Sequence, residues 1–325
     1  MGIVFDSDKT QKPTSKAEVL GVIFNTLSLG PYGSLFVQPR PSRVRNLTDT
    51  IDECVAMGVL TPSQAASIVG KFGFLCSTMF GKAGRCASLG VRSRQYSSSV
   101  ESKIFPSLET SLRLMQKFLE VCPPRELRVQ SNRPPFILYT DASDVPERSP
   151  RFGVGAVLID NTGPTQKISY FSWSVPPSLV DRWLPKKTYM GQLELLAAPI
   201  AISTWQSTLE NSKCLHFVDN DSASACLVRG YSPKADSCEI VGVYWLEASR
   251  TKTDIYIDRV ESKSNLSDGP SRFDFSLMRH LQALEVSPII PPSLESSSVS
   301  SWFEPLYPVS ACSPAALQSQ CLPKS

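Results

Sequence analysis

The segment from Phe136 to Val260 constrains the fold most. In it, short apolar runs typical of strands and longer runs with helical spacing follow one another in a definite order. Short strand-like runs occupy 136–140, 153–159 and 168–173, and a long helical pattern spans about 188–206. A strand at 214–218, helices at 221–229 and 237–249 and a strand at 254–260 complete the order. This order predicts an α/β domain with a mixed five-stranded sheet and flanking helices.

The first 130 residues have a different pattern, which predicts a small hairpin followed by helices. Residues 17–38 are typical of a β-hairpin with its turn around 30–33. One helix is expected to end near Gly58, and the next begins at Thr61, with a proline at its first position and Gln64 in place for a capping box. A third helix is expected over 107–120, and two Pro-Pro pairs at 123–124 and 134–135 mark a linker.

These patterns divide the chain into three parts. Residues 1–130 form the N-terminal region and residues 131–285 the α/β domain. Residues 286–325 are rich in Ser and Pro, and we expect them to be a disordered tail.

Composition narrows the class of protein. Hydrophobic residues make up 42% and charged residues 19% of the chain, as in soluble globular proteins. No apolar run reaches the roughly 18 residues of a membrane span, and the N-terminus lacks the features of a secretory signal. The nine cysteines include no C-x-x-C pair, which argues against a disulfide scaffold or a zinc ribbon. We therefore expect an intracellular protein, cytoplasmic or nuclear, that is not secreted and does not bind a membrane.

The net charge of +3 is unevenly distributed. Residues 1–130 carry 16 Lys and Arg against 10 Asp and Glu, whereas residues 131–285 carry 16 against 18. No acidic residue lies between Glu53 and Glu101, and the basic residues in that stretch are Lys71, Lys82, Arg85, Arg92 and Arg94. Such a stretch is typical of a surface that faces phosphate. On charge alone, a solvated helix face explains it equally well.

Four carboxylates stand out in the α/β domain. Three of them lie just after predicted strands, and one lies within a helix that is otherwise apolar. Asp141 and Asp219 follow apolar strands, Glu194 lies inside an apolar helix, and Asp268 follows the fifth strand. Each alone could cap a turn or pair with a nearby cation. Together, acids at the ends of neighbouring strands can converge, and a cluster of them is stable only with a cation. Oxygen ligands of this kind suit magnesium or manganese.

Five sequence blocks around these acids resemble the ribonuclease H domain of retroelement polyproteins. The blocks are Tyr139-Thr140-Asp141-Ala142-Ser143, Gly155-Ala156-Val157-Leu158, Gln192-Leu193-Glu194-Leu195-Leu196-Ala197, Val218-Asp219-Asn220 and Asn265-Leu266-Ser267-Asp268-Gly269-Pro270-Ser271-Arg272. The nearest kinds are the DIRS-like and LTR-type reverse transcriptases, and the resemblance covers about 136–280. Upstream, 19–22 and 38–72 are similar to the primer-grip hairpin and helical thumb of those polymerases.

The resemblance implies a metal-dependent endonuclease that hydrolyses the RNA strand of RNA–DNA hybrids. Asp141 would bridge two Mg²⁺ ions (Mn²⁺ being an alternative), Glu194 and Asp219 would complete one site, and Asp268 the other. Ser143, Gln192 and Asn220 would contact the substrate, although turn and helix-cap roles explain them equally well. The basic residues between 71 and 94 would hold a template–primer duplex.

Some features depart from the family pattern. No Asp-Asp doublet of a polymerase centre occurs, so the chain resembles a polyprotein fragment whose fingers and palm a polymerase subunit could supply. No histidine lies between Asp258 and Asp268, where many members carry a mobile one, and we expect His216 to be structural. Pro199 is expected to kink the helix that carries Glu194. The alternative function is therefore a catalytically inactive nucleic-acid-binding or structural remnant of a reverse transcriptase.

Overall fold

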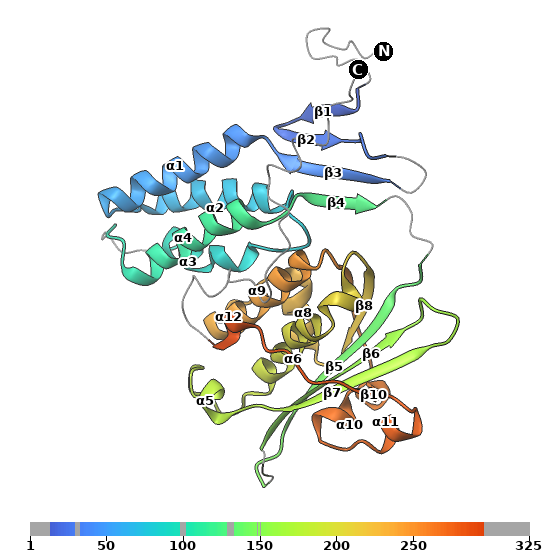
Figure 1. Ribbon diagram of the computed structural model, residues 1–325. Coiled ribbons are helices and arrows are strands. Elements are labelled where there is room, and N and C mark those ends of the chain that lie inside the picture. The colour runs from blue at the N-terminus through green and yellow to red at the C-terminus, as the bar shows by residue number, and fades with distance from the viewer. Residues whose placement is uncertain are drawn as a thin grey trace, which may run out of the picture.

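The fold is that of a computed structural model, which describes residues 14–29, 33–97, 102–128, 133–147, 149 and 151–295. An α/β domain lies below an N-terminal region that consists of a small sheet and a group of helices (Figure 1). Within the described residues, no helix is long and apolar enough to cross a bilayer.

A mixed sheet forms the centre of the α/β domain. Its strands, in the spatial order β10-β7-β6-β5-β8-β9, are β10 (Leu284–Glu285), β7 (Lys167–Ser174), β6 (Phe152–Asp160), β5 (Phe136–Asp144), β8 (Lys213–Val218) and β9 (Asp254–Arg259). The β5–β6–β7 meander is antiparallel, whereas β8 pairs parallel to β5 and β9 parallel to β8. The predicted α/β class with a mixed sheet and flanking helices is confirmed, and the two-residue β10 adds a sixth strand to the five expected.

Helices cover both faces of this sheet. On one face lies α6 (Met190–Thr204), which packs against α9 (Ala235–Arg250), with α8 (Asp221–Arg229) beside them. Residues 192–203 of α6 are all buried because the helix lies between the sheet and α9. The other face carries α10 (Asp268–Ser271) and α11 (Ser276–His280), whose Met278 packs in a smaller apolar cluster with Val157 and Tyr170. Three shorter helices, α5 (Pro177–Val180), α7 (Gln206–Leu209) and η3 (Ser262–Ser264), lie in the connections.

The N-terminal sheet differs from the predicted hairpin. It has four strands in the order β1 (Lys16–Val19), β2 (Val22–Asn25), β3 (Ser34–Pro39) and β4 (Arg125–Arg128). The part of the predicted hairpin before its turn at 30–33 forms two strands instead of one, joined by a turn at Leu20 and Gly21, where φ is +80° at the glycine, a value that favours a residue without Cβ. The predicted linker contains β4, which pairs with β3, so an expected connection forms part of the sheet instead.

The N-terminal helices largely match their sequence signals. Helix α1 (Pro41–Met57) ends at Gly58 in the left-handed conformation, and α2 (Pro62–Cys76) begins with the predicted capping box between Thr61 and Gln64. Helix α4 (Pro106–Val121) corresponds to the predicted 107–120. Between them, η2 (Arg85–Ser88) and α3 (Leu89–Gln95) were not predicted.

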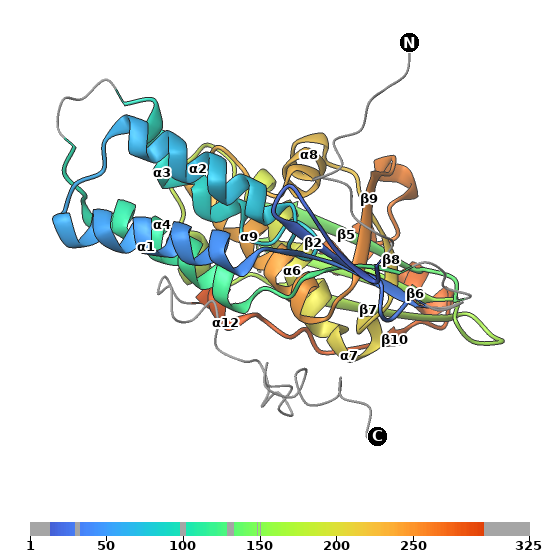
Figure 2. The same cartoon turned by 90° about the horizontal axis from the view of Figure 1, so that it is seen from above.

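The N-terminal helices and the α/β domain share one hydrophobic core. Buried residues of α1, α2 and α4 belong to the same apolar cluster as those of α6 and α9, and Figure 2 shows these helices on the side of the molecule where α9 lies. At the junction, Lys82 donates to the carbonyl of Val228 and lies 5.6 Å from the ring centre of Trp245. Arg85 donates to the carbonyl of Arg229 at 3.1 Å. Both cations thus meet the carbonyl end of α8, where backbone acceptors and the helix dipole attract positive charge.

The first residues of the predicted tail are ordered, so the expectation of disorder is wrong for 286–295. The Val286 N–H donates to the Tyr170 carbonyl at 2.9 Å, and α12 (Pro292–Glu295) places Leu294 in the core. Arg182 donates to the Leu294 carbonyl at 2.8 Å. Residues 296–325 lie outside the described residues.

Candidate functional site

Three of the four predicted acids meet at one edge of the central sheet. The parallel pairing of β5 with β8 ends at Thr140 and Val218. Asp141 and Asp219, the next residues after this pair, therefore lie at the same end of the two strands. Glu194, on the first turns of α6, approaches the same point. The carboxylates of Asp141, Glu194 and Asp219 each provide an oxygen, and these oxygens lie within 4.8 Å of one another.

Glu194 is buried in an apolar helix, and one of its carboxylate oxygens has no hydrogen-bond partner. Burial, with the nearby charges of Asp141 and Asp219, raises the pKa of Glu194 to about 9. The Oε2 atom is inaccessible to solvent and accepts no hydrogen bond from the protein. A buried carboxylate oxygen left in this state is costly unless a cation binds it.

Asp141 is buried as well, but one of its oxygens is bonded. The Ser271 hydroxyl donates to Asp141 Oδ2 at 2.5 Å. Burial raises the pKa of Asp141 to about 7, with a further contribution from the charges of Asp219 and Asp268, while the Ser271 hydrogen bond acts in the opposite direction. Near neutral pH the cluster therefore holds protons that a cation would displace.

Asp268 lies at the start of α10, close to the other acids but paired elsewhere. Its Oδ1 accepts from Arg272 Nε at 2.8 Å, and its side chain is 44% exposed. The loop before it is held against β5, because Asn265 Nδ2 donates to the Thr140 carbonyl at 3.2 Å. The structure thus brings three predicted acids together and places the fourth beside them in an ion pair.

Glycines of β6 allow α10 to approach the sheet closely. A Cβ atom at Gly155 would lie 2.8 Å from the Pro270 carbonyl carbon and closer still to Ser271 N. A Cβ at Gly153 would meet the Ser271 carbonyl oxygen. Since Asp141 pairs with Gly155, this contact brings Ser271 over Asp141.

The residues present fit a divalent cation with hard-ligand preference. Three carboxylates converge, one buried oxygen of Glu194 has no other partner, and the cluster contains no sulfur or nitrogen ligand. Such all-oxygen sites suit Mg²⁺ and Mn²⁺. Asp141, Glu194 and Asp219 would hold the first ion.

The three polar residues predicted to contact substrate all make contacts within the protein. Ser143 is buried, and its hydroxyl donates to the Ser271 carbonyl at 2.6 Å. Asn220 caps α8, its Oδ1 accepting from the Ala223 N–H at 3.0 Å. Asn220 thus has the helix-cap role that was its alternative, whereas Ser143 lies in strand β5 and bonds the end of α10.

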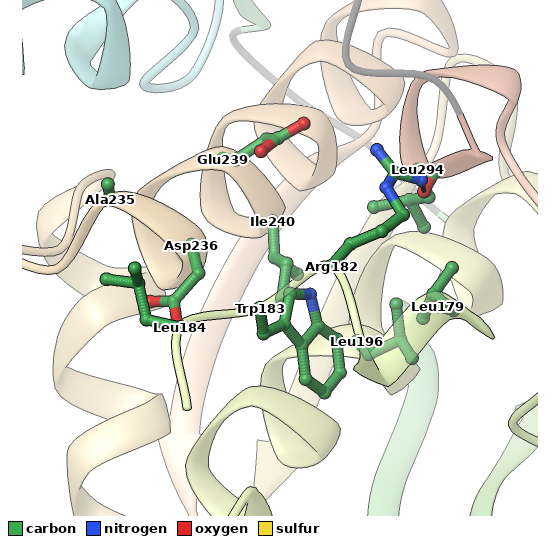
Figure 3. Close-up of a pocket in the computed structure, with 10 residues that line it drawn as sticks. All are labelled: Leu179, Arg182, Trp183, Leu184, Leu196, Ala235, Asp236, Glu239, Ile240 and Leu294. Carbon is green, nitrogen blue, oxygen red and sulfur yellow. Dashed lines mark hydrogen bonds between the residues drawn. The ribbon is translucent and has the colours of Figure 1, made fainter. Parts of the chain in front are cut away.

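Gln192 points away from the acids, towards α9. Its Nε2 donates to Asp236 Oδ2 at 3.0 Å, and Lys186 pairs with the same oxygen at 2.7 Å. Asp236 also borders a cavity of about 390 Å³, where its carboxylate turns toward Leu184 (Figure 3). Leu196 of α6 lines this cavity, which therefore lies on the opposite side of the helix from Glu194.

The predicted basic residues divide into two groups. Lys82 and Arg85 contact the end of α8, Arg92 stacks on Tyr231 with 5.5 Å to the ring centre, and buried Arg94 donates to the Lys103 carbonyl at 2.6 Å. Lys71 is exposed on α2. Contacts within the protein thus engage four of the five cations.

Two expected departures have clear outcomes. His216 is fully buried between the Thr140 hydroxyl at 2.8 Å and the Tyr244 hydroxyl at 2.9 Å, and burial lowers its pKa to about 3. It is therefore a neutral structural residue, as predicted. Helix α6 runs through Pro199 from Met190 to Thr204, and Glu194, before the proline, still meets the other acids.

Sequence reasoning did not assign Ser271 and Arg272 a role at the site. Ser271 links the acids, because its hydroxyl bonds both Asp141 Oδ2 and, at 2.9 Å, the carbonyl of Asp268. Arg272 pairs with the Asp268 carboxylate. The signal that could have found them is their position, three and four residues after an acid in a short helix.

Comparison with known proteins gives structural similarity without sequence similarity. No family model and no curated protein matches this chain. The N-terminal ribonuclease H domain of Rv2228c from Mycobacterium tuberculosis, solved as a maltose-binding protein fusion, is 13% identical with a TM-score of 0.32, over 46% of this chain and 98% of that one. Ribonuclease H1 from Halobacterium salinarum is 15% identical with a TM-score of 0.30, over 45% and 99%.

A longer stretch aligns with a viral polymerase. The foamy viral protease-reverse transcriptase, solved in complex with an RNA/DNA hybrid, is 9% identical with a TM-score of 0.30, over 81% of this chain and 53% of that one. The chain thus spans about half the length of that polymerase.

Proposed function

We propose that this chain is a divalent-metal-dependent ribonuclease H that hydrolyses the RNA strand of RNA–DNA hybrids. The observation that carries the proposal is the convergence of Asp141, Glu194 and Asp219 from a strand, a helix and a second strand end. The strongly raised pKa values of Asp141 and Glu194, both buried in this cluster, support a functional role for the site.

Each acid would have a distinct task. Asp141 would contribute a ligand to both of two Mg²⁺ sites, Glu194 and Asp219 would contribute to one of them, and Asp268 would contribute to the other. Bound there, the ions would activate a water for in-line attack on phosphorus and stabilise the leaving 3′ oxygen. The Ser271 hydroxyl orients Asp141. Addition of water across the P–O3′ bond leaves a 5′-phosphate and a 3′-hydroxyl.

The test is cleavage of a hybrid whose RNA strand is labelled, with Mg²⁺ or with EDTA. Wild type should cut the RNA strand only with Mg²⁺ and should leave duplex DNA intact. Asp141→Asn should reduce cleavage by at least about 10³-fold, since an amide lacks the anionic oxygen that bridges two ions. The matched control is Asp254→Asn, an exposed acid on β9. Full activity of Asp141→Asn would refute the assignment of the site.

A second candidate is a catalytically inactive module that binds nucleic acid or supports a partner. The internal contacts of Ser143, Gln192 and Asn220 favour it, because they leave these side chains engaged away from a substrate. This candidate predicts that the hybrid binds without being cut under any divalent ion, so the same assay separates the two.

We also propose a retroelement setting for the enzyme. Residues 1–130 would act as the thumb-like region of a reverse transcriptase, and a polymerase subunit would supply fingers and palm. The resemblance of the five sequence blocks to DIRS-like and LTR-type reverse transcriptases supports this proposal. A pull-down of the chain with separately expressed palm and fingers of such an element tests it.

A further inference from the structure

Arg272 is a cation beside the acidic cluster, and it forms an ion pair with Asp268. Its Nε lies 2.8 Å from Asp268 Oδ1, four residues earlier, and its side chain is 54% exposed. Burial is the main cause of the raised pKa values of Asp141 and Glu194. The positive charge of Arg272 acts in the opposite direction and lowers both pKa values. The guanidinium thus interacts electrostatically with all four acids.

Asp268 pairs with Arg272 and does not belong to the group of acids whose oxygens converge. The oxygens that lie within 4.8 Å of one another belong to Asp141, Glu194 and Asp219. Helix α10, which carries Asp268, is itself fixed to β6 through close contacts at Gly155. Since the backbone is held, the direction of the Asp268 side chain is decided by its partner, which here is Arg272.

A guanidinium and a divalent cation compete for the same carboxylates. The ion pair with Asp268 must loosen before that carboxylate can turn to an ion, and the positive charge of Arg272 repels a second cation nearby. We propose that Arg272 is a built-in counter-ion, which stabilises the metal-free site and sets the Mg²⁺ concentration at which the site fills. This inference rests on the proposed metal-dependent function.

The competition predicts opposite effects of one substitution on two measured quantities. Arg272→Gln should lower the melting temperature in EDTA, because the acids lose their counter-ion. It should also lower the Mg²⁺ concentration for half-maximal thermal stabilisation, by about tenfold, because the ion no longer competes with a fixed charge. Damage to the site by misfolding would weaken metal binding, so tighter binding is not a general consequence of substitution.

The experiment uses the full chain, Mg²⁺ alone and no nucleic acid, with thermal melts and isothermal titration calorimetry. Arg279→Gln on α11 removes the same charge outside the site and should bind Mg²⁺ as wild type does. Arg272→Lys keeps the charge and should stay within about twofold of wild type. Equal or weaker Mg²⁺ affinity of Arg272→Gln, or equal changes in the Gln and Lys variants, would overturn the counter-ion role. Asp141→Asn should show no thermal stabilisation by Mg²⁺. If the wild-type protein shows none either, the proposed metal-dependent function itself is overturned.

Discussion

Glu194 and Asp141 link the stability of the protein to pH. Burial raises their pKa values from the ordinary 4.5 and 3.8 to about 9 and about 7. The folded protein therefore binds protons more tightly than the unfolded chain does. Their contribution to the free energy of unfolding is fully present below about pH 4 and is lost as pH rises through the folded pKa values of about 7 and about 9.

Asp141→Asn should retain part of the stability that the wild-type protein loses as pH rises, because the amide carries no charge at any of these pH values. In EDTA at pH 8 the variant should melt roughly 2 °C higher than wild type, the shift that about 1 kcal/mol produces in a domain of this size. At pH 5 the two proteins should differ less, because the wild-type carboxyl is then protonated. Differential scanning calorimetry at both pH values measures this.

The control for that comparison is Asp254→Asn, which changes the same charge on an exposed strand position. It should melt like wild type at both pH values. A higher melting temperature for the Asp254 variant would mean that net charge, rather than the acidic cluster, explains the effect.

The short helix α10 shows how an element of four residues completes the site. It has too few residues to be stable alone, and its position depends on the glycines of β6, against which it packs without intervening side chains. Ser271 then bonds Asp141, and Arg272 reaches Asp268. Removing the close contact should therefore alter the site without altering any acid.

Gly155→Ala should displace α10, because a Cβ atom would lie 2.8 Å from the Pro270 carbonyl carbon. We expect a loss of about 1–3 kcal/mol in the free energy of unfolding, typical of overpacking, and a weaker stabilisation by Mg²⁺. Urea denaturation with and without Mg²⁺ measures both effects.

Gly163→Ala provides the matched control, since its nearest neighbour, the Thr165 carbonyl oxygen, would be 3.7 Å away. It should be close to wild type in both measurements. If Gly155→Ala also behaves as wild type, α10 does not depend on the close approach.

The two parts of the chain behave as one body in the packing of the core. Apolar residues of α1, α2 and α4 share a cluster with α6 and α9. Lys82, in the turn before η2, and Arg85, at its start, contact the end of α8. Gly230, which ends α8 at φ +79°, has no room for a Cβ because Lys82 lies against it. We therefore expect a single unfolding transition rather than separate ones for 1–130 and 131–285.

Lys82→Met tests this coupling. Four of the five tryptophans lie within 131–285 and the fifth lies in the segment 296–325, outside the described residues, so tryptophan fluorescence reports mainly on the α/β domain. The substitution lies in the N-terminal region, yet it should lower the fluorescence-detected stability by about 1–2 kcal/mol, through the lost carbonyl and aromatic contacts. Lys71 is an exposed residue of α2, so Lys71→Met should change the free energy of unfolding by no more than about 0.5 kcal/mol. A fluorescence transition unmoved by Lys82→Met would show that the parts unfold separately.

The same two variants test which cations meet nucleic acid. If α2 faces phosphate, Lys71→Met should reduce the slope of log affinity for hybrid against log salt by about 1. Lys82→Met should leave the slope unchanged, because its ammonium is engaged within the protein. Fluorescence anisotropy with a labelled hybrid measures both slopes, and an equal change in the two would contradict the assignment.

Local patterns in the chain were enough for most strands of the central sheet, for its main helices and for α1, α2 and α4. The period of the apolar residues located every strand of the central sheet except β10, and the capping box at Thr61 marked the start of α2. Asp141 and Asp219 directly follow the last paired residues of two neighbouring parallel strands, so they lie close together at the same end of the sheet. Such features depend on residues close in the sequence, or on a strand order that few folds permit.

Packing between distant segments decided the rest. That Lys82 and Arg85 meet the end of α8, that β4 joins the first sheet, and that Leu294 enters the core are contacts over long sequence separations. Nothing in the local pattern distinguishes a cation facing a helix end from one facing phosphate, since both are basic residues in polar stretches. Asp268 pairs locally with Arg272, four residues later, but only the placement of α10 against Gly155 brings this pair beside the other acids. The choice between these partners depends on which charges tertiary packing brings within a few ångströms, where Coulomb interactions become strong.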